Sequence, residues 1–400
     1  MKKWAVSCLI MFLLTDISAQ TAKNYSVKAE YLFGNIMQHT RHLERLVKGP
    51  VMGAEVAFEW QTMGEQNWQQ YFAFPAIGLG VVGLDLGNAE MLGQLAAVYP
   101  YLNFRLYDGR NLRVNLKGGA GMSFLNKTFN NTATHLNDLN TGNAAIGSIV
   151  NVYFAGGGSL EYKLGDGFSA MAGFQWNHAS NGSFYQPNSG INMLNTSLGV
   201  IYKPEFSRSF VPKRSDIPSL DKKWGVELVL AGGARELYYR DDKMFPTGSV
   251  VLNVNYQTGN HLRLGLGVDG FYDGVYNGDT HFKRTYLLTD ELENKFRVGV
   301  SLQPELVFGR IQAGIHFGLY LYNPLRNLEP VEIDPVTKQM IEPHFDKPLI
   351  YAYNIEEEDG WFYTRASFKY AITKHWFLSL GLKTHLQKAE FIEWGTGFRL

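Results

Sequence analysis

The chain has 400 residues, and its 37 lysines and arginines balance its 37 aspartates and glutamates, so the formal net charge is 0. This balance excludes the basic excess that nucleic-acid-binding proteins carry. The one cysteine, Cys8, lies in the N-terminal apolar run, so the rest of the chain has no disulfide, zinc–thiolate site or cysteine nucleophile. Aromatic residues at 14% and 42 glycines exceed what a soluble globular domain usually contains and favour a β-rich membrane protein.

Residues 1–19 are predicted to be a cleavable secretory signal peptide. Two lysines precede an apolar run over residues 4–14, and small residues ending in Ala19 precede Gln20. Its removal takes away two lysines and one aspartate, which leaves a formal charge of −1. The segment is therefore excluded from the fold, and the mature chain is expected outside the cytoplasm.

Sixteen segments with alternating apolar residues follow. In 311–322, every second residue from Ile311 to Leu321 is apolar, and the residues between them are glutamine, glycine, histidine or tyrosine. A period of two indicates strands, and runs of about ten residues match tilted strands that span a bilayer. The segments begin near residues 26, 51, 71, 91, 111, 149, 168, 194, 223, 247, 261, 296, 310, 361, 375 and 391.

The most nearly continuous apolar run after the signal peptide is 71–84. It falls short of the ~20 residues that a membrane helix needs. It also contains Pro75 and three glycines, which disfavour a helix. We therefore predict that 71–84 is a strand.

The connections between the segments alternate between short and long, with two exceptions, 63–70 and 205–221, which are long for the periplasmic side. Tight turns such as 108–110 and 165–167 are predicted on the periplasmic side, and the long loops are predicted to be extracellular. The long loops are 127–148, 181–193, 275–295 and 323–360. Short periplasmic turns with long outer loops are typical of bacterial outer-membrane barrels. The sequence therefore predicts an all-β fold, a transmembrane antiparallel β-barrel in the bacterial outer membrane.

A proline-containing segment, 205–221, divides the strands into two sets and leaves two architectures open. We favour one barrel of about 16 strands, with 205–221 as a long periplasmic turn, because two barrels need separate closure and insertion. The alternative is an eight-stranded barrel over 20–204 and a second one over 222–400. Residues 391–400 resemble the C-terminal signature that the barrel-assembly machinery recognises, with Leu400 in place of the usual phenylalanine.

A candidate catalytic pair stands at the end of the segment that begins near residue 168. His178 and Ser180 are two residues apart, so their side chains point to the same face of a strand. Phe174 and Trp176 share that face, whereas Gln175 lies on the other one. In a membrane barrel the apolar face touches lipid, so chemistry at this pair would act on a lipid.

Ester hydrolysis requires a nucleophile, a base, a group that orients the base and donors for the oxyanion. Ser180 is the candidate nucleophile and His178 the candidate base. The N–H groups of Asn181 and Gly182, with the Asn181 amide, are candidate oxyanion donors. If the hairpin pairs residue 178 with residue 192, Asn192 lies opposite His178 and orients its imidazole.

Other interpretations of this stretch remain. A His-x-Ser spacing arises easily by chance, and a strand-end histidine also serves as an anchor in an interfacial aromatic belt. The sequence offers His178 no second metal ligand at a suitable spacing, so neither a metal nor another cofactor is expected. The remaining histidines are treated as structural: His39, His42, His135, His261, His281, His316, His344, His375 and His385.

The stretch from His178 through Pro187, Asn188 and Gly190 to the next strand resembles the lipid A 3-O-deacylase (PagL-like, or acyloxyacyl hydrolase) family. The resemblance covers about 20–204 and implies an outer-membrane barrel with a lipid-facing His-Ser-Glu triad. It makes His178 the base, Ser180 the nucleophile and Asn181 an oxyanion residue. The family's glutamate, fourteen residues after the histidine, is Asn192 here. A slower enzyme is expected, although outer-membrane phospholipase A has an Asn-His-Ser arrangement.

The resemblance implies a carboxylic ester hydrolase that acts on lipid A or lipopolysaccharide among outer-membrane lipids. The alternative is a non-enzymatic barrel, either a porin-like channel or a scaffold. A polar inner face in the second half favours the channel, and its residues are Arg263, Asp269, Arg297, Gln303, Glu305, Gln312 and His316. The sequence does not indicate the oligomeric state.

Overall fold

The structure is a computed structural model. It describes residues 24–129, 142–205, 212, 214–220, 223–237, 239, 243–276, 292–323, 349–350, 352, 360–385 and 388–400. The predicted signal peptide lies outside these ranges, as do parts of the predicted loops 127–148, 275–295 and 323–360. The chain divides into two compact units, and the main division follows Ile217.

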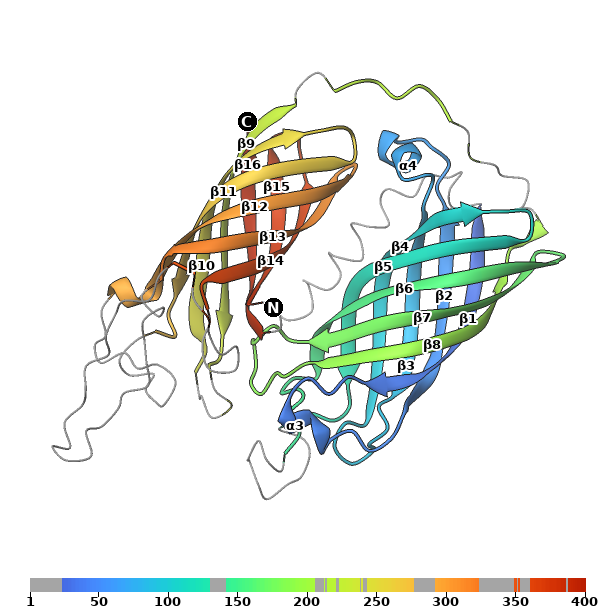
Figure 1. Ribbon diagram of the computed structural model, residues 1–400, viewed down its shortest axis with the longest axis horizontal. Helices are drawn as coiled ribbons and strands as arrows, with labels where there is room; N and C mark the ends of the chain where they lie inside the picture. The colour runs from blue at the N-terminus through green and yellow to red at the C-terminus, as the bar shows by residue number, and fades with distance from the viewer. Residues whose placement is uncertain are drawn as a thin grey trace. The chain divides into compact units, whose positions relative to one another are not determined.

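The first unit contains a closed barrel of eight antiparallel strands (Figure 1). Each strand pairs with the next, and β8 pairs with β1. The strands are β1 (Tyr25–Ile36), β2 (Val51–Gln61), β3 (Ala76–Asp85), β4 (Gln94–Asp108), β5 (Leu112–Leu125), β6 (Val150–Gly165), β7 (Phe168–Ser180) and β8 (Ile191–Tyr202). Two short helices, α3 (Arg41–Glu44) and α4 (Asn67–Tyr71), lie in its connections.

The second unit contains another closed barrel of eight antiparallel strands, in which β16 pairs with β9. Its strands are β9 (Trp224–Arg235), β10 (Phe245–Gln257), β11 (Leu262–Asp273), β12 (Phe296–Phe308), β13 (Ile311–Tyr322), β14 (Phe362–Ala371), β15 (Trp376–His385) and β16 (Lys388–Arg399). A short 3₁₀ helix, η2 (Leu292–Lys295), precedes β12.

The all-β antiparallel class and the sixteen strands are confirmed, but the single barrel that we favoured is wrong. The alternative with two barrels is the observed one. Residue pairs from Val27↔Tyr202 to Ile36↔Met193 join β1 and β8 along almost their whole length. This pairing satisfies the free edges of the first sheet, so neither edge is available to β9 or β16. Side chains alternate in the same way in one barrel of sixteen strands and in two barrels of eight, so the sequence pattern does not distinguish the two architectures.

The predicted strand over 71–84 is correct only in part, because β3 begins at Ala76. Tyr71 is instead the last residue of α4, and Ala73 and Phe74 adopt positive φ angles of 55° and 59°. Pro75 follows, and a proline cannot donate a ladder hydrogen bond. The apolar residues before Pro75 therefore belong to a helix and a turn, not to the strand.

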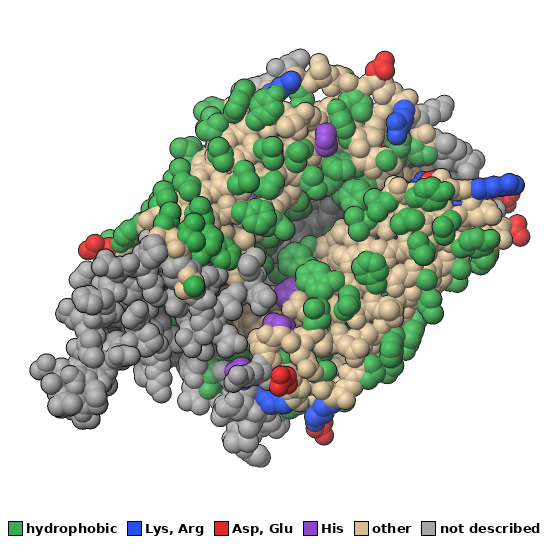
Figure 2. Space-filling view, viewed as in Figure 1, with side chains coloured by type: hydrophobic (Ala, Val, Ile, Leu, Met, Phe, Trp, Pro, Cys, Tyr) green, Lys and Arg blue, Asp and Glu red, His purple; other side chains and the backbone are tan. Residues whose placement is uncertain are grey.

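The outer surfaces of both barrels are apolar. In β11, Leu264, Leu266 and Val268 are 42%, 68% and 50% exposed, whereas Arg263 and Asp269 are 6% and 1% exposed. Hydrophobic side chains are spread over the visible walls of the strands (Figure 2). This outward apolar belt is what a lipid-facing barrel wall requires. Among the described residues, no helix has the length and apolar character needed to cross a membrane.

Polar side chains occupy part of the interior of the first barrel, and a cluster of buried hydrophobic side chains that includes Leu32 and Leu84 occupies another part. Glu55 accepts hydrogen bonds from the Tyr99 hydroxyl at 2.7 Å and from Lys117 Nζ at 2.8 Å. One layer away, Glu59 pairs with Lys28 at 2.6 Å and accepts from the Tyr101 hydroxyl at 2.9 Å. Eight strands leave an interior just wide enough for side chains, and in this layer the charged ones are paired.

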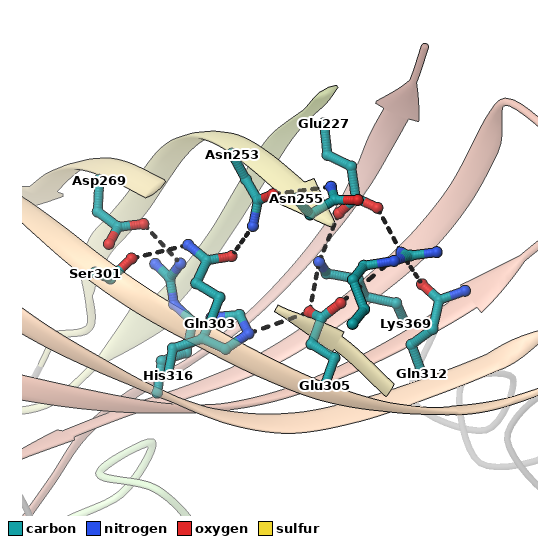
Figure 3. Close-up of polar contacts among 12 residues, drawn as sticks. Glu227, Asn253, Asn255, Asp269, Ser301, Gln303, Glu305, Gln312, His316 and Lys369 are labelled. Atoms are coloured by element: carbon teal, nitrogen blue, oxygen red, sulfur yellow. Dashed lines mark hydrogen bonds and ion pairs between the residues drawn. The ribbon is translucent and has the colours of Figure 1, made fainter. Parts of the chain in front are cut away.

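The interior of the second barrel is a network of buried ion pairs (Figure 3). Lys369 lies 2.7 Å from Glu227 and 2.6 Å from Glu305. Glu305 also contacts His316 Nε2 at 3.1 Å, and Arg263 pairs with Glu227 at 2.8 Å. All five of these residues are buried. Since an unpaired buried charge is strongly unfavourable, each carboxylate depends on its cations.

This network bears on the channel alternative. The seven residues that the channel interpretation assigns to a water-filled lumen are each at most 6% exposed: Arg263, Asp269, Arg297, Gln303, Glu305, Gln312 and His316. Arg263, Glu305 and His316 belong to the ion-pair network. Across the described strands, side chains thus occupy the space that an aqueous channel needs.

Replacing Lys369 is expected to destabilise the second barrel. Lys369→Met removes the cation shared by two buried carboxylates, so the free energy of unfolding should fall by about 3–5 kcal/mol. Guanidinium unfolding in lipid vesicles, followed by tryptophan fluorescence, measures this change. Lys374→Met, at an exposed lysine in the turn before β15, is the matched control. Equal stability of the two variants would contradict the assigned role of Lys369.

Candidate active site

Strand β7 places His178 on the outside of the first barrel, whereas Ser180, the last residue of the strand, is buried at 4% exposed. Along β7, Phe174 and Trp176 are 58% and 40% exposed, whereas Gln175 and Asn177 are buried in the interior. His178 continues the outward set and is half-buried at the end of the strand. The predicted assignment of the two faces is therefore confirmed for β7 as far as His178, and the exposure of Ser180 to lipid is not observed.

The His178 ring is held by the hairpin partner that the sequence indicated. The register pairs His178 with Asn192 on β8, and His178 Nδ1 lies 2.8 Å from Asn192 Oδ1. An amide oxygen only accepts, so Nδ1 carries the proton and donates it to Asn192. Nε2 then keeps its lone pair, which is the form that a general base requires.

Aromatic side chains pack against the same ring. Trp176 stacks on His178 with ring centroids 5.8 Å apart and an interplanar angle of 11°. Phe154, on the neighbouring strand β6, lies 6.2 Å away at 31°. The imidazole therefore sits in an apolar surround on the barrel wall, with its orientation fixed by packing as well as by Asn192.

Ser180 and His178 converge on one glycine. A Cβ atom placed on Gly190 would lie 3.0 Å from His178 Cε1 and 3.4 Å from Ser180 Cβ. Gly190 also has a φ angle of +74°, which favours glycine. Among the described residues, Ser180 and His178 are not joined by a hydrogen bond. Such bonds are often long in a site without substrate.

Asn181 braces the loop that follows β7. Its backbone N–H donates to Asn188 Oδ1 at 3.1 Å. Its side-chain amide donates to Ser148 Oγ at 2.8 Å and to the Tyr185 carbonyl at 2.9 Å. These donors stabilise the loop in this structure, so an oxyanion role for Asn181 requires an exchange of hydrogen-bond partners.

His39, which the sequence analysis treats as structural, lies beside Asn192. Its Nδ1 is 3.4 Å from Asn192 Nδ2 and 3.1 Å from the Met37 carbonyl, and its Nε2 is 2.9 Å from the Ser189 carbonyl. His39 comes close to Asn192 because the barrel closes between β1 and β8, where Ile36 at the end of β1 pairs with Met193. A single barrel of sixteen strands would separate these two segments.

No metal centre accompanies these residues. Within the ranges that the structure describes, no group of three or more histidine, cysteine, aspartate or glutamate side chains is arranged to hold a metal ion. The groups that lie together at this site are a serine hydroxyl, an oriented imidazole and the amides of the loop.

Both barrels match known protein families. Residues 52–200 match the model of lipid A 3-O-deacylase (PagL). Residues 224–331 and 350–400 match the model of the acyloxyacyl hydrolase C-terminal domain. No curated protein matches the chain.

Several solved outer-membrane barrels are similar to part of the chain. Neisserial surface protein A is 9% identical with a TM-score of 0.31, covering 45% of this chain and 97% of that one. The outer membrane enzyme PagL is 15% identical with a TM-score of 0.28, covering 43% and 97%. The N-terminal β-barrel domain of Pseudomonas aeruginosa OprF is 16% identical with a TM-score of 0.26, covering 45% and 98%.

The two family models lie one on each barrel and carry the names of the same hydrolase group. The chain therefore belongs to the lipid A 3-O-deacylase (PagL) and acyloxyacyl hydrolase family of outer-membrane β-barrels.

Proposed function

We propose that the chain is an outer-membrane lipid esterase that hydrolyses an acyl ester of lipid A. Ser180 is the nucleophile and His178 the general base, on the outer wall of the first barrel. The observation that carries the proposal is the 2.8 Å contact between His178 Nδ1 and Asn192 Oδ1, because it leaves Nε2 as a base on a lipid-facing surface. Membership of the deacylase family supports lipid A as the substrate.

The reaction follows the serine hydrolase scheme. Ser180 Oγ attacks the ester carbonyl while His178 Nε2 takes its proton, which gives a tetrahedral intermediate and an imidazolium. The imidazolium returns the proton to the sugar oxygen as the carbon–oxygen bond breaks. Water then releases the fatty acid from Ser180, again with His178 as the base. Asn192 holds the ring throughout but offers no negative charge to the imidazolium.

The oxyanion requires N–H donors where β7 ends. We assign this role to the backbone N–H of Gly182 and to Asn181, which exchanges a loop contact for the oxyanion when substrate binds. Gly182 has a φ angle of +62°, so the backbone turns sharply directly after Asn181. Removing one oxyanion donor from a hydrolase typically lowers the rate about 10²–10³-fold.

His39 determines which end of the Asn192 amide faces His178. When His39 donates its Nε2 proton to the Ser189 carbonyl, its Nδ1 lone pair accepts from Asn192 Nδ2. The amide oxygen is then directed to His178. A flipped amide would instead present N–H to His178 and favour the wrong tautomer, which is costly in a serine hydrolase.

We also propose a role for each segment of the chain. Residues 1–19 direct export, 20–204 carry the esterase site, 205–221 form a periplasmic linker and 222–400 form the second barrel. Residues 391–400, which include most of β16, are the proposed signal for the barrel-assembly machinery. The proposed substrate is lipopolysaccharide of the outer leaflet, because Ser180 lies at the long-loop end of the first barrel and long loops are expected on the extracellular side.

Ser180→Ala should abolish the activity. Mass spectrometry of lipid A from cells that produce the wild-type chain should show the loss of one acyl group, and Ser180→Ala should leave lipid A intact. Thr196→Ala removes a hydroxyl from the same outer surface and serves as the control. Intact lipid A in all three strains, with the barrels correctly inserted, would favour the scaffold alternative.

Asn192→Glu should raise the turnover number. A carboxylate orients His178 and also stabilises its imidazolium, so kcat should rise about tenfold or more. The measurement is the rate of fatty-acid release from lipid A in mixed micelles. Asn192→Gln keeps an amide at the length of glutamate, so a similar rise with that variant would show that charge is not the cause.

His39→Phe should lower kcat about tenfold when residue 192 is asparagine, a loss of about 1.4 kcal/mol in transition-state stabilisation. In the Asn192→Glu background the same change should have little effect. Either oxygen of a carboxylate can accept the hydrogen bond from His178, so its orientation does not depend on His39. The His178 tautomer, read from imidazole ¹⁵N shifts, should change with His39→Phe and not with the control His42→Phe. An equal loss of kcat in both backgrounds would refute the orienting role.

A further inference from the structure

The donors of Asn181 are all engaged in this structure. Its Nδ2 carries two hydrogens, which go to Ser148 Oγ at 2.8 Å and to the Tyr185 carbonyl at 2.9 Å. Its backbone N–H donates to Asn188 Oδ1 at 3.1 Å. An oxyanion needs donors directed at it, so one of these contacts has to break before Asn181 can act. The described conformation is therefore a resting state of the proposed site.

The contact between Asn181 and Tyr185 is the harder one to break. It joins residues four apart in the same loop through two hydrogen bonds. Asn181 Nδ2 donates to the Tyr185 carbonyl, and the Tyr185 N–H donates to Asn181 Oδ1 at 3.3 Å. Turning the amide away from Tyr185 would remove both bonds and leave two backbone groups without these partners.

The contact between Asn181 and Ser148 is a single hydrogen bond to a different connection, the one between β5 and β6. Asn151 Nδ2 donates to the Ser148 carbonyl at 2.8 Å, so Asn151 Oδ1 is left to accept from Ser148 Oγ at 2.7 Å. The hydroxyl has one hydrogen, and Asn151 takes it, so Ser148 Oγ acts toward Asn181 only as an acceptor. When Asn181 leaves, Ser148 keeps its bond to Asn151 and one hydrogen bond is lost.

The backbone on both sides of Ser148 is tied to the end of the barrel. The Gly190 N–H donates to the Ala145 carbonyl at 2.9 Å, and the Leu125 N–H donates to the Ile149 carbonyl at 2.9 Å. Ser148 is thus a fixed acceptor, and the Asn181 side chain is the group that has to rotate.

We propose that Ser148 is a positioning residue that holds Asn181 in the resting state, and that one Asn181 hydrogen passes from Ser148 Oγ to the oxyanion during the reaction. This inference rests on the proposed esterase function and adds a regulating contact to it. Only a hydrogen-bond partner changes, and the covalent steps are those given above. A charged acceptor binds an N–H group more strongly than a hydroxyl does, so the exchange is favourable once the tetrahedral intermediate forms. The contact therefore limits kcat and leaves substrate binding unaffected.

Ser148→Ala should raise kcat about three- to tenfold, because a neutral hydrogen bond no longer opposes the release of Asn181. The full-length chain in mixed micelles is assayed for fatty-acid release from lipid A, and KM should stay the same. Ser148→Thr keeps a hydroxyl and should behave as the wild type. In the Asn181→Ala background, Ser148→Ala should have no further effect. Ser159→Ala, at a serine on β6, is the matched control.

A second measurement does not depend on turnover. The Asn181 side-chain amide of the ¹⁵N-labelled chain in detergent micelles is identified by its absence from the spectrum of Asn181→Ala. Its hydrogen exchange should become about tenfold faster or more in Ser148→Ala, because exchange requires the hydrogen bond to open. Ser148→Thr and Ser159→Ala should leave the exchange rate unchanged.

The outcomes separate this inference from the esterase function. If the wild type is active and Ser148→Ala leaves kcat unchanged or lowers it, Ser148 does not restrain Asn181 and the inference is wrong, while the esterase function stands. Unaltered amide exchange in Ser148→Ala would also overturn it. Inactivity of every chain, with Ser148→Ala and Asn192→Glu included, would refute the esterase function and this inference with it.

Discussion

Closure of each sheet after eight strands is the constraint on which the rest of the structure depends. Backbone N–H and C=O groups cannot remain unpaired in a hydrocarbon layer, so the free edge of β8 must find a partner, and it finds β1. An eight-stranded ring has no room for an aqueous pore. The inward residues must therefore fill the interior, and the polar ones must pair. The ion pairs inside both barrels follow from this geometry.

The strands themselves were predictable because alternation is local. Each run of alternating residues shows which side chains point outward, and β7 and β11 have the faces that this pattern predicts. Closure is not local. A register such as Val27↔Tyr202 joins residues far apart in the chain, and alternation is identical whether eight or sixteen strands close. The predicted start of β3 is also wrong, because Tyr71 belongs to helix α4, whose Gln70 is hydrogen-bonded to Ser215, far away in the sequence.

The same distinction applies to the site. His178 and Asn192 face each other across one hairpin, so counting along the two strands was enough to pair them. His39 enters the site only because β1 lies beside β8, which no local pattern indicates. The loop contacts of Asn181 with Ser148 and Tyr185 likewise depend on how connections fold over the strand ends. Residues within one hairpin could thus be assigned from sequence, and those contributed by closure could not.

The pairing of first and last strands also has a consequence for the ancestry of the chain. In each barrel the strand that enters the sheet lies beside the strand that leaves it. A cut or fusion in the connection after residue 202 therefore interrupts no hydrogen-bonded ladder. Gene duplication or recombination at that point joins or separates intact modules, and each half can diverge under its own selection. Two barrels matched by two different models of one family are the pattern that such a history leaves.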